Sequence, residues 1–199
     1  MNDTKGDLDL HATGQDPDSD DIMNMSYAGF WSRFGAHFVD SLILMPVLVA
    51  ITWALSFSKS ASVALTLPIS MVAPAYSIIL HARYGQTVGK MAAKIGVFRV
   101  SGEPIGWREA ALRNSVDIAL DLVSTASTVF VMTRLEDGAW GRGWLQLFGR
   151  VNALEPSWSR WVGYAAFVWF WSELVTMLFN RKKRALHDLI AGTVVVRTI

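Results

Sequence analysis

Ionisable side chains stand inside an apolar segment of this sequence, residues 31–57, "WSRFGAHFVDSLILMPVLVAITWALSF". Arg33, His37 and Asp40 are spaced i, i+4 and i+7, which places them on one face of a helix. A charged residue at the centre of a membrane helix costs roughly 2.5–3.5 kcal/mol on insertion scales, so such residues usually face a protein interior or a water-filled cavity. A carboxylate and an imidazole in that setting could bind a cation or exchange protons.

A second stripe of the same kind is formed by Arg113, Asp117 and Asp121, at i, i+4 and i+8, and Glu173 lies in the apolar stretch "VWFWSELV". Two interpretations are open for these charges. They can be buried ion pairs that set how the helices pack, or they can form a site that binds ions. The depth of each residue in its helix is needed to choose between the two.

Residue types for other chemistries are scarce. The chain has no Cys, and no HExxH or GxSxG pattern connects its histidines, which are scattered at His11, His37, His81 and His187. We therefore expect no enzyme, no metal centre and no cofactor.

Two motifs have simple interpretations. "GQTVGK" has neither the glycine spacing nor the Ser or Thr of a phosphate-binding loop, and we expect Lys90 and Lys94 to meet anionic lipid headgroups instead. The run "RKKR", residues 181–184, follows an apolar stretch directly and is interpreted as a topology anchor. No nucleic-acid partner is expected.

The composition is that of a membrane protein, since 52% of the 199 residues are hydrophobic. Four stretches have the length of about 20 mostly apolar residues that a membrane helix needs: residues 34–57, 61–82, 115–133 and 161–180. Pro68 and Pro74 predict a kink in the second stretch. The expected fold class is an all-α membrane protein with four transmembrane helices.

The distribution of basic residues predicts the orientation. Six Lys or Arg lie in residues 83–113 and five follow residue 180, whereas only Lys59 lies between the first two stretches. By the positive-inside rule, both termini and the loop at residues 83–113 are cytoplasmic. Residues 1–26 carry seven Asp against Lys5 and predict a disordered acidic tail, which leaves residues 27–199 as the transmembrane domain.

The connections between the stretches contain short elements. Residues 95–100 and 193–197 read as strands, and because two lone strands are unstable unless paired, we expect residues 97–100 to pair with residues 194–196. Ser101 to Pro104 predict a turn, and an amphipathic helix from about Trp107 runs into the third stretch. In the loop 134–160, near-helical spacing suits either a segment lying on lipid or packing against the helices; the residues concerned are Trp140, Trp144, Leu147 and Phe148.

Three stretches together resemble the RDD family of small bacterial membrane proteins: "RFGAHFVD", then "GQTVGKMAAKIGVFRV" with "GEPIGWREAALRN", and finally "RALHDLIAGTVVV". The family takes its name from an Arg at the start of the first membrane helix, an Asp within it and a second Asp elsewhere. The resemblance assigns these to Arg33, Asp40 and Asp188. It implies a polytopic membrane protein, with transport of ions or small solutes as the usual suggestion.

The depth of Arg33 predicts its partner. Helical side chains lean toward the N-terminus of their helix, so Arg33 points to the cytoplasmic edge and away from Asp40, which His37 is better placed to reach. Asp188 follows the fourth stretch by eight residues and lies at the level of Arg33. We therefore expect an ion pair between Arg33 and Asp188.

Three acids from three helices share one predicted depth. Asp40, Asp121 and Glu173 lie six or seven residues, about 10 Å, from the cytoplasmic ends of their stretches. We expect these three carboxylates to converge on a site where a cation competes with protons, with Asp117 nearer the mouth and His37 relaying protons. The alternative is that each acid anchors its own helix.

The expected function is proton-coupled transport of a monovalent cation or a small charged solute across the bacterial cytoplasmic (inner) membrane. Four helices make a thin wall for a pathway, so we expect a homo-oligomer or a larger membrane protein as partner. The alternative function is a non-transporting module that assembles, stabilises or regulates another membrane protein or binds lipid.

Overall fold

A computed structural model of the chain describes residues 26–198. The predicted acidic tail, residues 1–26, lies outside these described residues except for Ser26. The Ser26 carbonyl accepts the backbone N–H of Arg197 at 3.0 Å, so the described part begins against the C-terminal strand.

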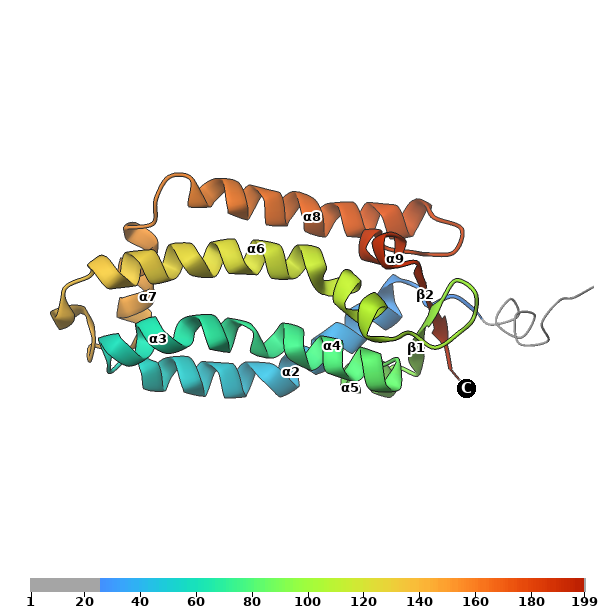
Figure 1. Cartoon of the computed structure of the whole chain (residues 1–199), viewed down its shortest axis with the longest axis horizontal. Coiled ribbons are helices and arrows are strands. Elements are labelled where there is room, and N and C mark those ends of the chain that lie inside the picture. Colours follow the sequence, from blue (N-terminus) through green and yellow to red (C-terminus); the bar gives the residue numbers. More distant parts are fainter. Residues whose placement is uncertain (1–25, 199) are drawn as a thin grey trace, which may run out of the picture.

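Four apolar helical segments run side by side and form the body of the molecule (Figure 1). They are α2 (Phe30–Leu55), the pair α3 (Lys59–Ser70) and α4 (Val72–Tyr84), α6 (Trp107–Arg134), and α8 (Ser159–Phe179). Each is long and apolar enough to cross a membrane. The four predicted spans and the mostly helical fold class are therefore confirmed, with ends that differ from the prediction by a few residues. The helix predicted from about Trp107 is also confirmed, because it is continuous with the third stretch in α6.

The predicted kink in the second span falls between α3 and α4, at Met71. Pro74 lacks the backbone N–H that would donate to the carbonyl of Ser70, so the helical ladder is interrupted at this point. Pro68 is accommodated inside α3.

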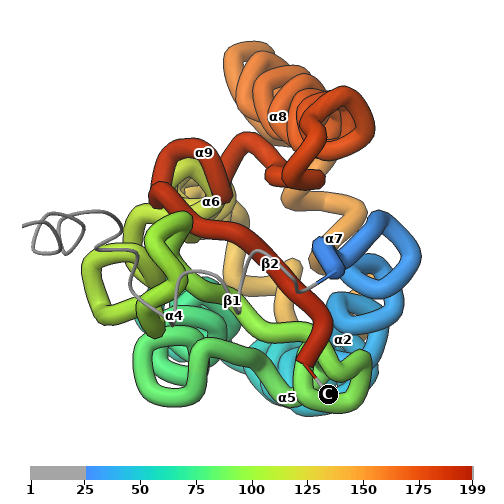
Figure 2. The backbone as a smooth tube through the Cα atoms, turned by 90° about the vertical axis from the view of Figure 1, so that its right-hand side faces the viewer, coloured from blue at the N-terminus to red at the C-terminus, as the bar shows by residue number. Residues whose placement is uncertain are grey.

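The central helix is α6, which contacts α3, α4, α7, α8 and α9. Figure 2 shows α8 on one side of α6, and α4 and α2 on the other side. The long helix α2 packs chiefly against the short α5 (Val88–Ala92). This arrangement leaves room between α2, α4 and α6, and again between α6 and α8.

A two-stranded antiparallel sheet covers one end of the helices, which we call the sheet end (Figure 2). β1 (Ile95–Arg99) pairs with β2 (Thr193–Arg197) in the register Val97 to Val195, so the predicted pairing is confirmed. Tyr27 adds a bridge to β2, which brings both ends of the described chain to the sheet end. The core beneath the sheet is small and apolar, and consists of Ala28, Ala36, Ile95, Val97, Ile105 and Val195.

The opposite end carries α7 (Trp144–Ala153) and the short helix η1 (Asp137–Ala139). Both interpretations of its aromatic residues apply. Trp140 and Leu147 are buried, and the Trp140 indole donates to the Ser62 hydroxyl at 3.0 Å. Trp144 and Phe148 are exposed, as expected of a segment lying on lipid.

Candidate functional site

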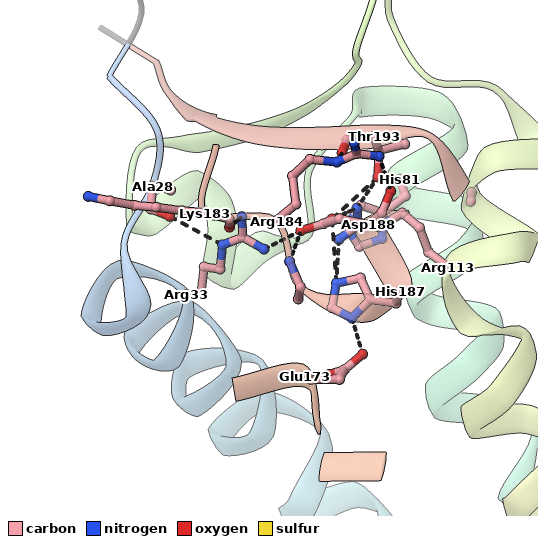
Figure 3. A network of polar contacts seen from close by, with 12 residues as sticks. Ala28, Arg33, His81, Arg113, Glu173, Lys183, Arg184, His187, Asp188 and Thr193 are labelled. Carbon is pink, nitrogen blue, oxygen red and sulfur yellow. Dashed lines mark hydrogen bonds and ion pairs between the residues drawn. The ribbon is translucent and has the colours of Figure 1, made fainter. Parts of the chain in front are cut away.

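Asp188 lies at the centre of a polar network at the sheet end (Figure 3). It is the third residue of α9 (Leu186–Ala191), is fully buried, and accepts the backbone N–H of Ala185 at 3.0 Å. Arg33 donates to Asp188 Oδ2 at 2.5 Å and Arg113 donates to Oδ1. The predicted contact between Arg33 and Asp188 is present, whereas Arg113 is a partner that the sequence analysis missed.

Both arginines also donate to groups other than Asp188. Arg33 Nη2 donates to the Lys183 carbonyl at 2.6 Å and Nε to the Ala28 carbonyl at 3.3 Å. Arg113 also donates to the Thr193 hydroxyl at 2.6 Å. The network therefore joins α2, α6, α9 and β2 through one carboxylate.

The charge on Asp188 is strongly stabilised. Burial by itself would raise the pKa of this carboxyl, but the positive charges of Arg113 and Arg33 hold the pKa well below its ordinary value. A buried carboxylate with two arginines in contact is a fixed structural anion rather than a group that exchanges protons near neutral pH.

His187 extends the network to α8. Its Nε2 lies 2.9 Å from Arg113 Nη2, which can only donate, so Nε2 accepts and the ring hydrogen is on Nδ1. Nδ1 then donates to Glu173, the acid that had no assigned partner in the sequence. Glu173 is thus connected through His187 to the Asp188 network (Figure 3).

Asp40 belongs to a separate cluster formed with α4 and α5. Its Oδ1 accepts the Tyr76 hydroxyl at 2.8 Å and the Gly89 N–H at 2.7 Å, and its Oδ2 accepts the Thr87 hydroxyl at 2.6 Å. The donors to Asp40 therefore come from α4 and the segment at α5, and not from His37. His37 lines the same cavity as Asp40.

The expectation that Lys90 meets lipid headgroups is wrong. Lys90 is only 3% exposed, and its Nζ lies 2.6 Å from His81 Nε2. The cause is the close packing of α5 on α2, where a Cβ on Gly89 would overlap the Ala36 carbonyl. Lys94, four residues later, is exposed.

Two cavities separate the acids that were predicted to share a site. Asp40 and His37 line a cavity of about 560 Å³ between α2, α4 and α6. Asp121 and Glu173 line another, of about 460 Å³, between α6 and α8. Asp117 lines both cavities and accepts the Trp169 indole N–H at 2.9 Å.

The structure therefore brings Asp121, Glu173 and Asp117 to one cavity and places Asp40 and His37 in the other. The number of residues along a helix gives the depth of a side chain but not the direction in which it points around the helix. Asp40 points to α4 and α5, whereas the α6 and α8 acids face each other.

Four apolar helices with ionisable side chains enclosed between them define a multi-pass α-helical membrane protein. The family model described as the RDD family matches residues 27–192, most of the chain, and the protein belongs to that family. No curated protein and no solved structure matches the chain. The resemblance noted in the sequence is thus confirmed.

Proposed function

We propose that this protein moves a monovalent cation or a small charged solute across the bacterial inner membrane, coupled to protons. The observation that carries the proposal is the cavity between α6 and α8. Four carboxylates line it, and none of the described residues around it is Lys or Arg; the acids are Asp117, Asp121, Glu155 and Glu173. Such a lining attracts cations and excludes anions.

The acids are distributed along the helices rather than gathered at one level. Asp117 and Asp121 lie one turn apart on α6, and the α8 residues that line the cavity run from Ser159 to Glu173, about 21 Å of helix. Glu155 precedes α8 at the α7 end. The hydrocarbon core of a bilayer is about 30 Å thick, so this cavity extends over much of its depth.

The hydrogen bonding of these acids also supports a cation or proton site. Asp121 Oδ2 is buried and finds no hydrogen-bond donor among residues 26–198. A buried carboxylate oxygen without a donor is costly unless a proton or a cation neutralises the group. Asp121 is therefore the residue that we assign to direct cation binding.

At the sheet end the route continues through Glu173 and His187 toward the cytoplasm. The basic residues near the sheet support this orientation, because Arg181, Lys182 and Lys94 are exposed there. With this orientation both termini are cytoplasmic and α7 lies at the outer surface. The thin four-helix body favours a homo-oligomer or a larger partner as the working form.

Purified protein in sealed vesicles tests the proposal. A pH gradient is imposed, Na⁺ or K⁺ is added, and the decay of the gradient is compared with that in protein-free vesicles. Cation-dependent decay above the protein-free level is the expected result. No flux, together with reproducible co-purification of one membrane protein, would instead support the module that assembles or regulates a partner.

A further inference from the structure

A buried pair of nitrogen bases lies beside the Asp40 cavity. His81 on α4 and Lys90 on α5 are 4% and 3% exposed, and His81 Nε2 is 2.6 Å from Lys90 Nζ. Neither the predicted site nor the α6–α8 cavity includes this pair. Two buried titratable groups held this close titrate as a coupled pair.

The hydrogen-bond partners of His81 determine which ring nitrogen carries its hydrogen. Nδ1 lies 2.7 Å from the Ser77 carbonyl oxygen, which can only accept, so Nδ1 carries a hydrogen. Nε2 can then accept from Lys90, or it can carry a second proton while Lys90 accepts as a neutral amine. In either arrangement the pair holds one positive charge at most.

That charge has no carboxylate in direct contact among the described residues. Among residues 26–198 Lys90 forms no ion pair with a carboxylate, and both oxygens of Asp40 are occupied by other donors. The charged and titratable groups that act on the pair through their charge are Arg33, His37 and Asp40 from α2, Arg113 from α6, and His187 and Asp188 from α9.

The positive members of this set act against protonation. Burial first, and then the charge of Arg113, hold the pKa of Lys90 well below its ordinary value, while Asp188 and Asp40 offset only part of the effect. The proton on the pair is therefore weakly held compared with that on an exposed lysine.

The position of Lys90 is set by Asp40. The Thr87 hydroxyl donates to Asp40 and accepts the Lys90 backbone N–H at 3.3 Å, and the neighbouring Gly89 N–H donates to the same carboxylate. Lys90 thus sits behind His81, which itself lines the cavity with Asp40 and Asp117. The pair meets the cavity through His81.

We propose that His81 and Lys90 together form the proton-binding site of this protein, holding a single exchangeable proton that is taken up from and released to the cavity lined by His81. A cation in the α6–α8 cavity near Asp117, which also lines the His81 cavity, repels the positive charge on the pair, so a proton leaves when a monovalent cation enters. This inference rests on the proposed transport function.

Nitrogen NMR on the intact protein in lipid nanodiscs tests the proton site without a flux measurement. The chain has six lysines, and labelling their Nζ atoms with ¹⁵N, with Lys90→Met to assign one signal, isolates Lys90. We expect Lys90 to lose its proton at lower pH than the other lysines, and at lower pH still when Na⁺ replaces N-methylglucamine. Titration together with the other lysines, or no response to Na⁺, would overturn the proposal.

Variants in sealed vesicles give the second readout. Lys90→Met and His81→Gln should still pass Na⁺ but should lose the dependence of flux on the pH gradient. Lys94→Met is the matched control, because Lys94 is exposed, and should behave as the natural protein. Gradient-dependent flux that survives both substitutions would contradict the assignment. If the natural protein passes no Na⁺, the proposed function fails, and the NMR titration still decides whether this pair is a cation-sensitive proton site.

Discussion

Asp188 illustrates what a single buried carboxylate does in this protein. It contacts two arginines from different helices and the N-terminal turn of its own short helix, with no exposure to solvent. Removing one partner of a buried ion pair leaves an uncompensated charge, which typically costs about 3–5 kcal/mol. The network therefore fixes how α2, α6 and α9 are arranged.

Substitution of this network should give non-additive losses. Asp188→Ala leaves two buried arginines unpaired and should cost about 3–5 kcal/mol, whereas Arg33→Ala leaves Asp188 with Arg113 and should cost less. The double variant should be no worse than Asp188→Ala alone. Thermal denaturation of the detergent-solubilised protein measures each effect, and fully additive losses would argue against the contact. Arg99→Ala, at a more exposed ion pair, is the control and should change little.

The same carboxylate predicts a pH dependence. Because the folded-state pKa of Asp188 is lowered, its charge stabilises the fold above the unfolded pKa of about 3.9, and this stability is lost as pH falls toward the folded value. The penalty of Asp188→Asn should thus be constant from about pH 8 to pH 5 and should shrink below about pH 4. Denaturation temperatures across this range measure it, and a penalty that disappears already near pH 6 would contradict the assignment.

The sequence predicted the Arg33–Asp188 contact for a physical reason. Helical side chains lean toward the N-terminus of their helix, so Arg33 points to the membrane edge at which Asp188 is also expected. It did not predict Arg113 as a partner or the pairing of His187 with Glu173. Both depend on how α9 folds back under α6 and α8, and a six-residue helix leaves little periodic signal in the sequence.

At the scale of elements, the short helix α5 has the largest effect for its length. Gly89 lets α5 approach α2 so closely that its N–H reaches Asp40, and this approach buries Lys90. From the sequence, the same glycine-rich segment was expected to be a surface turn. Nothing in the local sequence pattern indicates that Lys90, the residue after Gly89, is buried.

Gly89→Ala should destabilise this packing. An added Cβ would overlap the Ala36 carbonyl and lie 2.8 Å from Asp40 Cγ, so α5 must move away from α2. Overpacking of this kind typically costs about 1–3 kcal/mol. Gly35→Ala on α2 is the matched control, since a Cβ there meets nothing within 4 Å. Denaturation temperature and membrane yield report the difference, and equal behaviour of the two variants would contradict the packing described.

The two-stranded sheet was predictable for a simple reason. Each of the two β-rich segments needs a partner strand. Both segments follow basic residues that are expected at the same membrane surface, so each is the nearest candidate partner for the other. The acid layer was not predictable in this way. Rise per residue gives depth, but the direction of Asp40 around α2 follows from packing that only the tertiary structure contains.

The orientation of the protein in the membrane can be tested by cysteine labelling. The chain contains no Cys, so single cysteines can be introduced without other changes. Arg142→Cys at the α7 end and Lys94→Cys at the sheet end both replace exposed residues. In intact cells a membrane-impermeant maleimide should label the first variant only, and permeabilised cells should show both. Labelling of Lys94→Cys in intact cells would reverse the proposed orientation.

Two cavities lie on either side of α6, and Asp117 lines both of them. One contains the acids assigned to the cation, and the other contains the bases assigned to the proton. Separation of the two by one helix allows a cation to influence proton binding through charge alone. The central claim is that the cavity between α6 and α8 carries the cation.

The most direct test of that claim is the cation-dependent decay of a pH gradient in vesicles that contain Asp121→Asn. Asp121 has a buried oxygen that finds no donor among residues 26–198, and its replacement by Asn removes the negative charge while nearly preserving shape. Asp137→Asn, at an exposed aspartate near α7, is the matched control. The flux through Asp121→Asn should fall to the rate of protein-free vesicles at normal protein levels, whereas Asp137→Asn should keep the natural rate. Natural flux through Asp121→Asn would contradict that claim.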